Sequence, residues 1–217
     1  MNQRITAIVL ATAVVLATAV LAARSGVVHL PSNQQDYEPE QPIAFSHRLH
    51  VGDLRMACLY CHPNAERSRV AGVPATAICM NCHRFVTAPL GAVRDEEQRA
   101  AKAGQTPRLV VSSELRKLFD AMGLDERLQS SPGTPPRPIV WTRVHNLPDY
   151  VAFDHRPHVA AGVTCQTCHG PVETMERVRQ TSDLSMGWCV NCHRAANRTG
   201  IGGRAVRASI DCSTCHY

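Results

Sequence analysis

The sequence predicts a mostly helical and loop-rich fold, with little regular secondary structure and with bound groups in place of a large side-chain core. Only 5% of the 217 residues are aromatic, so few large rings are available to fill an interior. No long stretch alternates apolar and polar residues as a strand would. All ten cysteines fall into five copies of one frame, CxxCH, which indicates that bound groups or cross-links hold the chain together.

The chain begins with a segment that has the length and composition of a membrane span. Residues 5–23 carry no charge and, as a helix, form an apolar cylinder roughly 28 Å long. Arg4 precedes the segment, and a positive N-terminal flank favours a cytoplasmic N-terminus with the rest of the chain exported. A cleaved signal peptide is the alternative, although the apolar cores of signal peptides are usually shorter. We expect a retained transmembrane anchor.

The rest of the chain contains an internal duplication. An FxHxxH pattern at 45–50 precedes one CxxCH frame, and a second FxHxxH pattern at 153–158 precedes another. Each copy continues to a further frame within CMNCHR or CVNCHR, and a fifth frame follows at the C-terminus. The predicted boundaries are 5–23 for the anchor, 24–41 for a tether, 42–87 for the first module, 88–139 for a linker or insertion, and 140–217 for the second module.

The insertion is expected to have little structure apart from one short helix near 113–122. Ser112 or Ser113 is the predicted cap of this helix, and Gly123 suits its end. Leucine, phenylalanine and methionine recur between them at helical spacing, which indicates a packing face.

The five CxxCH frames, named first to fifth along the chain, span residues 58–62, 79–83, 165–169, 189–193 and 212–216. CxxCH is the attachment frame of c-type haem. Two thiols add to the vinyl groups on one edge of the porphyrin, and the next histidine lies under the iron as its proximal ligand. The predicted thioether cysteines are Cys58, Cys61, Cys79, Cys82, Cys165, Cys168, Cys189, Cys192, Cys212 and Cys215. The predicted proximal ligands are His62, His83, His169, His193 and His216. The expected architecture is therefore a transmembrane helix followed by a multihaem cytochrome c domain organised around five covalently bound haem c groups.

Zinc sites, disulfides and thioredoxin-like redox pairs also use paired cysteines. Zinc takes such pairs two at a time, so five pairs is an odd number for it, and it gives no reason for a histidine after every pair. Thioredoxin-type pairs occur singly within a βαβ pattern, which this sequence lacks. The frames therefore favour covalent haem.

The net charge of +5 rests on arginine, with 21 Arg against two Lys. The arginines are scattered, with no basic helix and no interleaved aromatic residues, so nucleic-acid binding is not expected. Arginine is well suited to pair with carboxylates. Because five haems bring ten propionates, the charge of +5 would become −5 before iron is counted, and the arginines are the expected partners of these groups.

The sixth ligands decide whether any iron has an open position for a substrate. Six of the eleven histidines lie outside the frames. His29 lies at the edge of the apolar segment, where a solvated interfacial role is expected. The predicted distal ligands are His47, His50, His145, His155 and His158. If all five bind iron, every haem is six-coordinate and low-spin, and the chain carries electrons without catalysing bond chemistry itself.

Methionine is the competing sixth ligand. Met186 lies three residues before Cys189, and Met56 and Met80 also lie near frames. Methionine most often fills gaps in a core. One histidine/methionine haem would have a raised potential, and Met186 is the first candidate for that ligand.

The haem-paired FxHxxH pattern resembles that of the class III multihaem cytochromes. The similarity is closer to the pentahaem cytochrome c subunit of alternative complex III, a bacterial quinol-oxidising respiratory complex, and residues 41–84, 144–170 and 185–194 carry it. The resemblance implies that His47 ligates the haem of the first frame and His155 that of the third. His50 and His158 would then reach across to other haems.

The same resemblance implies a membrane-anchored electron-transfer subunit without catalysis of its own. Its implied partners are an iron–sulfur subunit resembling molybdopterin oxidoreductases and polytopic membrane subunits that bind quinol. Electrons would pass on to a monohaem cytochrome c, a copper protein or a terminal oxidase. The implied location is the bacterial inner membrane, with the haem domain on the periplasmic side.

Three other functions remain open. A small membrane-anchored multihaem quinol dehydrogenase would touch quinol itself and would have an unusual or missing sixth ligand beside the membrane. A nitrite- or hydroxylamine-type reductase would need one five-coordinate haem. A free electron shuttle would be cleaved from its anchor and would be found in a soluble extract.

Overall fold

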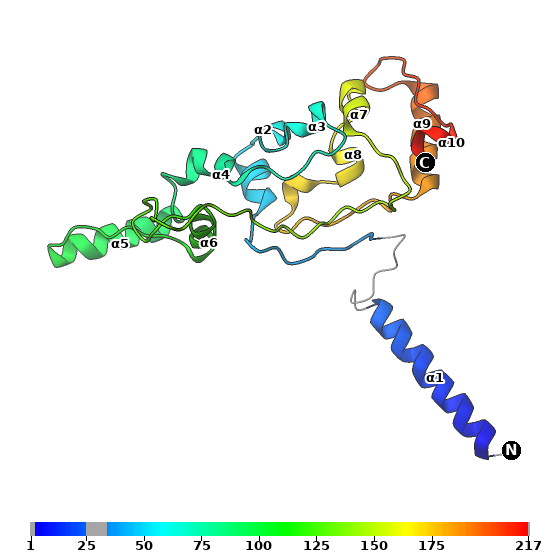
Figure 1. Ribbon diagram of the computed structural model, residues 1–217, viewed down its shortest axis with the longest axis horizontal. Coiled ribbons are helices and arrows are strands. Elements are labelled where there is room, and N and C mark those ends of the chain that lie inside the picture. Colours follow the sequence, from blue (N-terminus) through cyan, green and yellow to red (C-terminus); the bar gives the residue numbers. More distant parts are fainter. Residues whose placement is uncertain (1–2, 25–33, 217) are drawn as a thin grey trace.

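A computed structural model describes residues 3–24 and 34–216 (Figure 1). The described chain is helical and irregular, and its β pairing is limited to isolated bridges, so these residues contain no strand. This agrees with the predicted helical and loop-rich class. The helices are α1 (Gln3–Arg24), the π-helix η1 (Arg48–Asp53), α2 (Cys58–Cys61), α3 (Asn64–Arg67), α4 (Thr76–His83), α5 (Leu90–Ala103), α6 (Ser113–Ala121), α7 (His155–Ala161), α8 (Gln166–His169), the 3-10 helix η2 (Val172–Thr174), α9 (Met186–Thr199) and α10 (Cys212–Cys215).

The N-terminal helix α1 is long and apolar enough to cross a membrane. Its window Arg4–Leu21 has a mean hydropathy of 2.2, and none of the window is buried against the rest of the chain. The Thr12 hydroxyl donates to the carbonyl of Ile8 one turn earlier, so this polar group has a partner within the helix. A signal sequence has the same length and composition, so these properties fit both an anchor and a leader.

Extended segments around residues 36–41, 142–146 and 180–182 are joined by hydrogen bonds. Gln180 is only 1% exposed, and its side chain accepts from the Asn146 N–H and donates to the Ser182 carbonyl. Its backbone carbonyl accepts from the Asp36 N–H at 2.7 Å. Since a buried amide without partners would be costly, these bonds fix the register of three segments that are far apart in sequence.

The side-chain core is small and lies beside α6. Ile43, Leu118 and Phe119 form the buried cluster, and Met80 of α4 packs against it. Most other buried hydrophobic residues are alanines, which contribute little apolar volume. The small core agrees with the low aromatic content of the chain.

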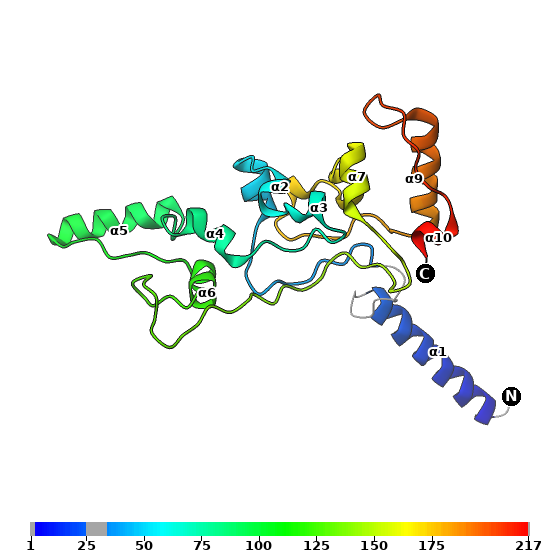
Figure 2. The same ribbon diagram turned by 45° about the horizontal axis from the view of Figure 1, so that its top comes forward.

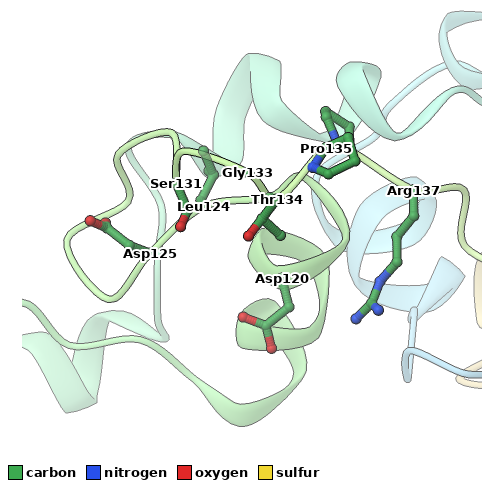
Figure 3. Close-up of a pocket in the computed structure, with 10 residues that line it drawn as sticks. Asp120, Leu124, Asp125, Ser131, Gly133, Thr134, Pro135 and Arg137 are labelled. Atoms are coloured by element: carbon green, nitrogen blue, oxygen red, sulfur yellow. The ribbon is translucent and has the colours of Figure 1, made fainter.

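Helix α6 lies where the sequence predicts a helix. The Ser112 hydroxyl accepts from the Leu115 N–H at 3.3 Å, and Gly123 just beyond the helix has φ +69°. Residues 123–137 fold back over α6 and enclose a pocket of about 550 Å³, which Asp120 and Arg137 flank (Figure 3). All residues that line this pocket fall between 120 and 137, outside the five cysteine frames.

The expectation of a low-structure segment before α6 is wrong, because residues 90–103 form the 14-residue helix α5. Alanine, arginine, glutamate and glutamine favour this helix, and Gly104 ends it with φ +64°. The Glu96 carboxylate accepts from Arg99 and from the Arg108 N–H, which ties the helix to the returning chain. In Figures 1 and 2, α5 projects from the body at the end opposite α9 and α10.

The two duplicated modules contact each other crosswise. η1 of the first module lies against η2 of the second, where the Arg48 N–H donates to the Met175 carbonyl at 2.8 Å. α7 of the second module packs against α3 of the first. The FxHxxH segments of both modules are therefore held from two sides.

Candidate functional site

All five frames lie on helical turns, in α2, α4, α8, α9 and α10. Cysteines three positions apart on such a turn project from neighbouring positions on one face. All ten thiols are free, and each is exposed or half-exposed rather than buried. The thiols are therefore accessible for addition to vinyl groups on one edge of a porphyrin.

Histidines from different segments face each other in pairs. Ring centroids are 6.2 Å apart for His50 and His83, 6.4 Å for His155 and His169, and 5.9 Å for His158 and His193. Metal–imidazole bonds are about 2 Å long, so two imidazoles on opposite faces of one iron have centroids roughly 6 Å apart. The three pairs therefore have the spacing of axial ligands, and each joins a histidine of an FxHxxH segment to a histidine of a frame.

Backbone carbonyls hold the Nδ1 atoms of six candidate ligand histidines. Their partners are carbonyl oxygens at 2.5–2.8 Å, in the pairs His50–Ser46, His62–Gly72, His83–Val86, His155–Arg69, His158–Asp154 and His193–Ser209. An imidazole whose Nδ1–H donates to a carbonyl has an unprotonated Nε2, which is the form that binds metal. The backbone thus orients the rings and fixes the tautomer that a ligand needs.

His47 is the buried histidine of the first FxHxxH segment. Its pKa is lowered to about 4, first by burial and then by the neighbouring His62 and His50 in that order. Its Nδ1 is buried without a hydrogen-bond partner. The ring is therefore neutral at pH 7 and close to His62, the frame histidine to which the resemblance assigns it.

A phenylalanine packs against both histidines of each FxHxxH segment. Phe45 has ring centroids 4.9 Å from His47 and 4.3 Å from His50. Phe153 lies 4.8 Å from both of its histidines, His155 and His158. One phenylalanine ring therefore supports two imidazoles that lie near different frames.

The predicted distal ligand His145 and the frame histidine His216 have neighbours that differ from those of the three pairs. The Nε2 of His145 lies 3.2 Å from the Nδ1 of His169, with ring centroids 4.3 Å apart at an angle of 80°. His216 has the ring of Tyr150 at 5.8 Å. Burial, followed by the nearby His155, lowers the pKa of His145.

The methionine candidates lie in three different settings. Met186 is the first residue of α9 and is 69% exposed. Met80 packs against the core cluster, while Met56 is half-buried. His29 lies outside the described residues. The ligand role of Met186 stays a prediction.

Thiols of different frames lie close to one another, so the frames can be put in a spatial order as one series. The first three frames along the chain form its first part. Burial raises the pKa of Cys79, and the thiol of Cys61 in the first frame adds to the rise. Burial also raises the pKa of Cys165 in the third frame, followed by charge interaction and a hydrogen bond with Cys58 of the first. The first frame therefore lies between the second and the third.

The series continues through the second module. Burial raises the pKa of Cys168 in the third frame to about 11, and Cys192 and Cys189 of the fourth frame contribute next. Burial of Cys189 raises its pKa as well, with Cys215 of the fifth frame as the following cause. The spatial order of the frames is second, first, third, fourth and fifth.

These residues fit iron porphyrin: paired thiols on a turn, a histidine next to them, and an opposed imidazole at axial spacing. When bound, haem supplies a one-electron ferric/ferrous couple. Within residues 3–24 and 34–216, no three His, Cys, Asp or Glu side chains gather as a ready metal-binding group.

The hydrogen-bond partners of three frame histidines could not be predicted from the sequence, because they are backbone carbonyls. The carbonyls of Gly72, Val86 and Ser209 hold frame histidines, and nothing in those residue types signals it. Phe45 and Phe153 were visible in the repeated FxHxxH pattern, but their contact with two imidazoles each was not.

Comparison with known proteins supports the same class. Residues 151–217 match the family of cytochrome c7 and related cytochrome c. The match lies within the second module and contains three of the five frames, so the similarity to c-type cytochromes is shown for that part of the chain. The chain is similar to the "Menaquinone reductase, multiheme cytochrome c subunit" of Nitratidesulfovibrio vulgaris, with 27% identity over 201 residues that cover 82% of this chain and 78% of the relative.

Proposed function

We propose that this chain is the membrane-anchored electron-transfer subunit of a respiratory complex that exchanges electrons with a quinone. The observation that carries the proposal is the set of histidine pairs at 5.9–6.4 Å, each with one histidine in a CxxCH frame. Irons held by two imidazoles have no open position, so such sites pass electrons and bind no substrate.

The chain's own residues have three tasks in this function. The ten frame cysteines would hold haem as thioethers, and the five frame histidines would bind its iron. His47, His50, His155 and His158 would hold the iron as second ligands, together with His62, His83, His169 and His193 respectively. The backbone carbonyls that hold Nδ1 keep the rings in place, so little reorganisation accompanies a change of iron charge.

The order of the frames gives the electron path. The contact of Cys58 with Cys165 joins the first and third frames, and with them the two modules. Electrons would then move along the second, first, third, fourth and fifth sites. The second frame lies beside α5 and α6, and the fifth lies at the C-terminus. The proposed electron path would therefore have its two ends at these two places.

The finer proposal is a subunit of alternative complex III type, in which quinol is oxidised. The expected partners are an iron–sulfur subunit of molybdopterin-oxidoreductase type, polytopic quinol-binding subunits, and a periplasmic acceptor such as a monohaem cytochrome c. The name of the Nitratidesulfovibrio relative favours a second candidate, in which the complex reduces menaquinone. The same ligand set serves either direction, because the haem potentials and the partners decide the flow.

The proposed location follows from α1. Arg4 precedes an apolar helix, so the N-terminus would stay in the cytoplasm and the haem domain would lie in the periplasm of the inner membrane. Retention of α1 in the mature chain is part of this proposal.

Purification from detergent-solubilised membranes tests the function. We expect the chain to co-purify with iron–sulfur and polytopic subunits, and its mass to exceed the polypeptide mass by five haems. Menaquinol oxidation with a periplasmic acceptor would favour the alternative complex III type, whereas menaquinone reduction by a reduced cytochrome would favour the second candidate. Quinol oxidation by the isolated chain, or a soluble chain without α1, would contradict the proposal.

A further inference from the structure

We propose that His145 is not an axial ligand but a positioning residue that holds the proximal histidine of the third frame, His169. The inference rests on the haem assignment of the proposed function, and its test begins with a haem count so that the two can fail separately.

The surroundings of His169 differ from those of the other frame histidines with a described Nδ1 contact. His62, His83 and His193 each place Nδ1 at a backbone carbonyl oxygen. The Nδ1 of His169 instead lies 3.2 Å from the Nε2 of His145. A side-chain imidazole thus takes the place that a carbonyl holds at the other sites.

The geometry suits a hydrogen bond and not a pair of axial ligands. The His145 and His169 centroids are 4.3 Å apart at 80°, well below the spacing of roughly 6 Å that two ligands of one iron require. The position opposite His169 at that spacing belongs to His155, whose centroid lies 6.4 Å away with the two planes 6° apart. His155 and His145 therefore have separate roles toward the same ring.

The hydrogen bond also occupies the atom that ligation would need. If His169 donates its Nδ1–H, the Nε2 of His145 is the acceptor and has no lone pair left for iron. A neutral imidazole is a stronger base than a peptide carbonyl, so it draws more electron density onto His169 and stabilises the ferric state. The third site should then have a lower potential than a carbonyl partner would give.

A consequence concerns the fifth frame. With His145 engaged at His169, none of the described histidines outside the frames remains for His216, whose ring neighbour is Tyr150. The sixth position of the fifth haem is therefore not supplied by His145.

The test compares His145→Ala, His145→Gln and His155→Ala in the full chain within its membranes. Mass spectrometry first verifies that each variant has the haem content of the parent. Low-temperature paramagnetic resonance then counts high-spin ferric haems, and a potentiometric titration follows each midpoint. His155→Ala is the matched control, because it removes the proposed distal ligand of the same site and should add one high-spin haem.

We expect His145→Ala to add no high-spin haem and to raise the midpoint of one haem while the others stay in place. His145→Gln, whose Oε1 can accept from His169, should restore that midpoint. A new high-spin signal in either His145 variant would overturn the inference, since it would make His145 a ligand. Unchanged midpoints in His145→Ala would overturn the positioning role. If His145→Ala does not mature, the spin state of His145→Gln alone decides, because glutamine does not replace histidine as a strong-field ligand.

Discussion

His158 on α7 and His193 on α9 face each other with ring centroids 5.9 Å apart, although 34 residues separate them in the chain. Each Nδ1 is held by a carbonyl, from Asp154 and Ser209 respectively. The Asp154 carboxylate also accepts from the Arg156 N–H and so caps the helix that carries His158. The cap and the carbonyls set the ring positions from both sides.

The first prediction removes the distal member of this pair. His158→Ala should leave the iron of the fourth site five-coordinate, because no second imidazole then occupies its sixth coordination position. We expect one more high-spin ferric haem per chain than in the parent, and about one more carbon monoxide bound per chain after reduction. Optical titration with carbon monoxide provides the measurement.

Ala160→Ser is the control for that change. Ala160 lies on the same helix and is exposed, so the substitution should leave the spin state of every haem as in the parent. A low-spin His158→Ala protein with full haem content would show that His158 is not a ligand.

Roles in haem attachment and ligation could be predicted for the frames and the FxHxxH segments from the sequence, because both functions need fixed residue types at fixed spacing. Helix α6 was equally readable, since Ser112 and Gly123 mark its ends. The helix α5 was missed although its composition favours a helix, because its charged residues suggested an unstructured insertion. The partner of His145 was not predictable, because the two rings lie 24 positions apart in the sequence and only the tertiary fold brings them together.

The second prediction concerns the order of the irons. Anomalous diffraction at the iron edge from crystals of the haem-loaded protein should place the first site between the second and third, because Cys61 meets Cys79 and Cys58 meets Cys165. The fourth iron should lie between the third and fifth. The order would be contradicted if the iron of the second frame had the iron of the fourth or fifth frame as its nearest neighbour.

The third prediction concerns the arm formed by α5 and the returning chain. The guanidinium of Arg99, and after it the Arg108 N–H, lower the pKa of Glu96 from its ordinary 4.5 to about 2. A lowered pKa means that the folded arm prefers the ionised carboxylate, so its stabilisation is complete above pH 4.5 and is lost as the pH falls toward 2. Amide exchange at Arg108, corrected for its intrinsic rate, should therefore rise between pH 5 and pH 3.

Glu96→Gln should reproduce this loosening at neutral pH, because it removes the charge that both partners bind. We expect trypsin to cleave after Arg108 several-fold faster than in the parent. Glu97→Gln, an exposed neighbour on the same helix, is the control and should cleave at the parental rate. Equal trypsin cleavage rates for the Glu96→Gln and Glu97→Gln variants would show that Glu96 does not hold the arm in place.

The last prediction concerns the contact between the two modules at Gly52. A Cβ added there would overlap the carbonyl oxygen of Glu173 on η2, and this backbone atom cannot move aside cheaply. Gly52→Ala should therefore push η1 away from η2 and destabilise the protein by about 2 kcal/mol, as overpacking commonly does. Because η1 carries His50, we also expect the paramagnetic resonance signal of the second haem to broaden while those of the fourth and fifth stay sharp.

Gly91→Ala is the matched control, since nothing lies within 4 Å of its added Cβ and the change favours a helix. Thermal unfolding should separate the two, with a lower midpoint for Gly52→Ala and an equal or higher one for Gly91→Ala. Equal midpoints and unchanged spectra would mean that the close approach of η1 to η2 does not position His50.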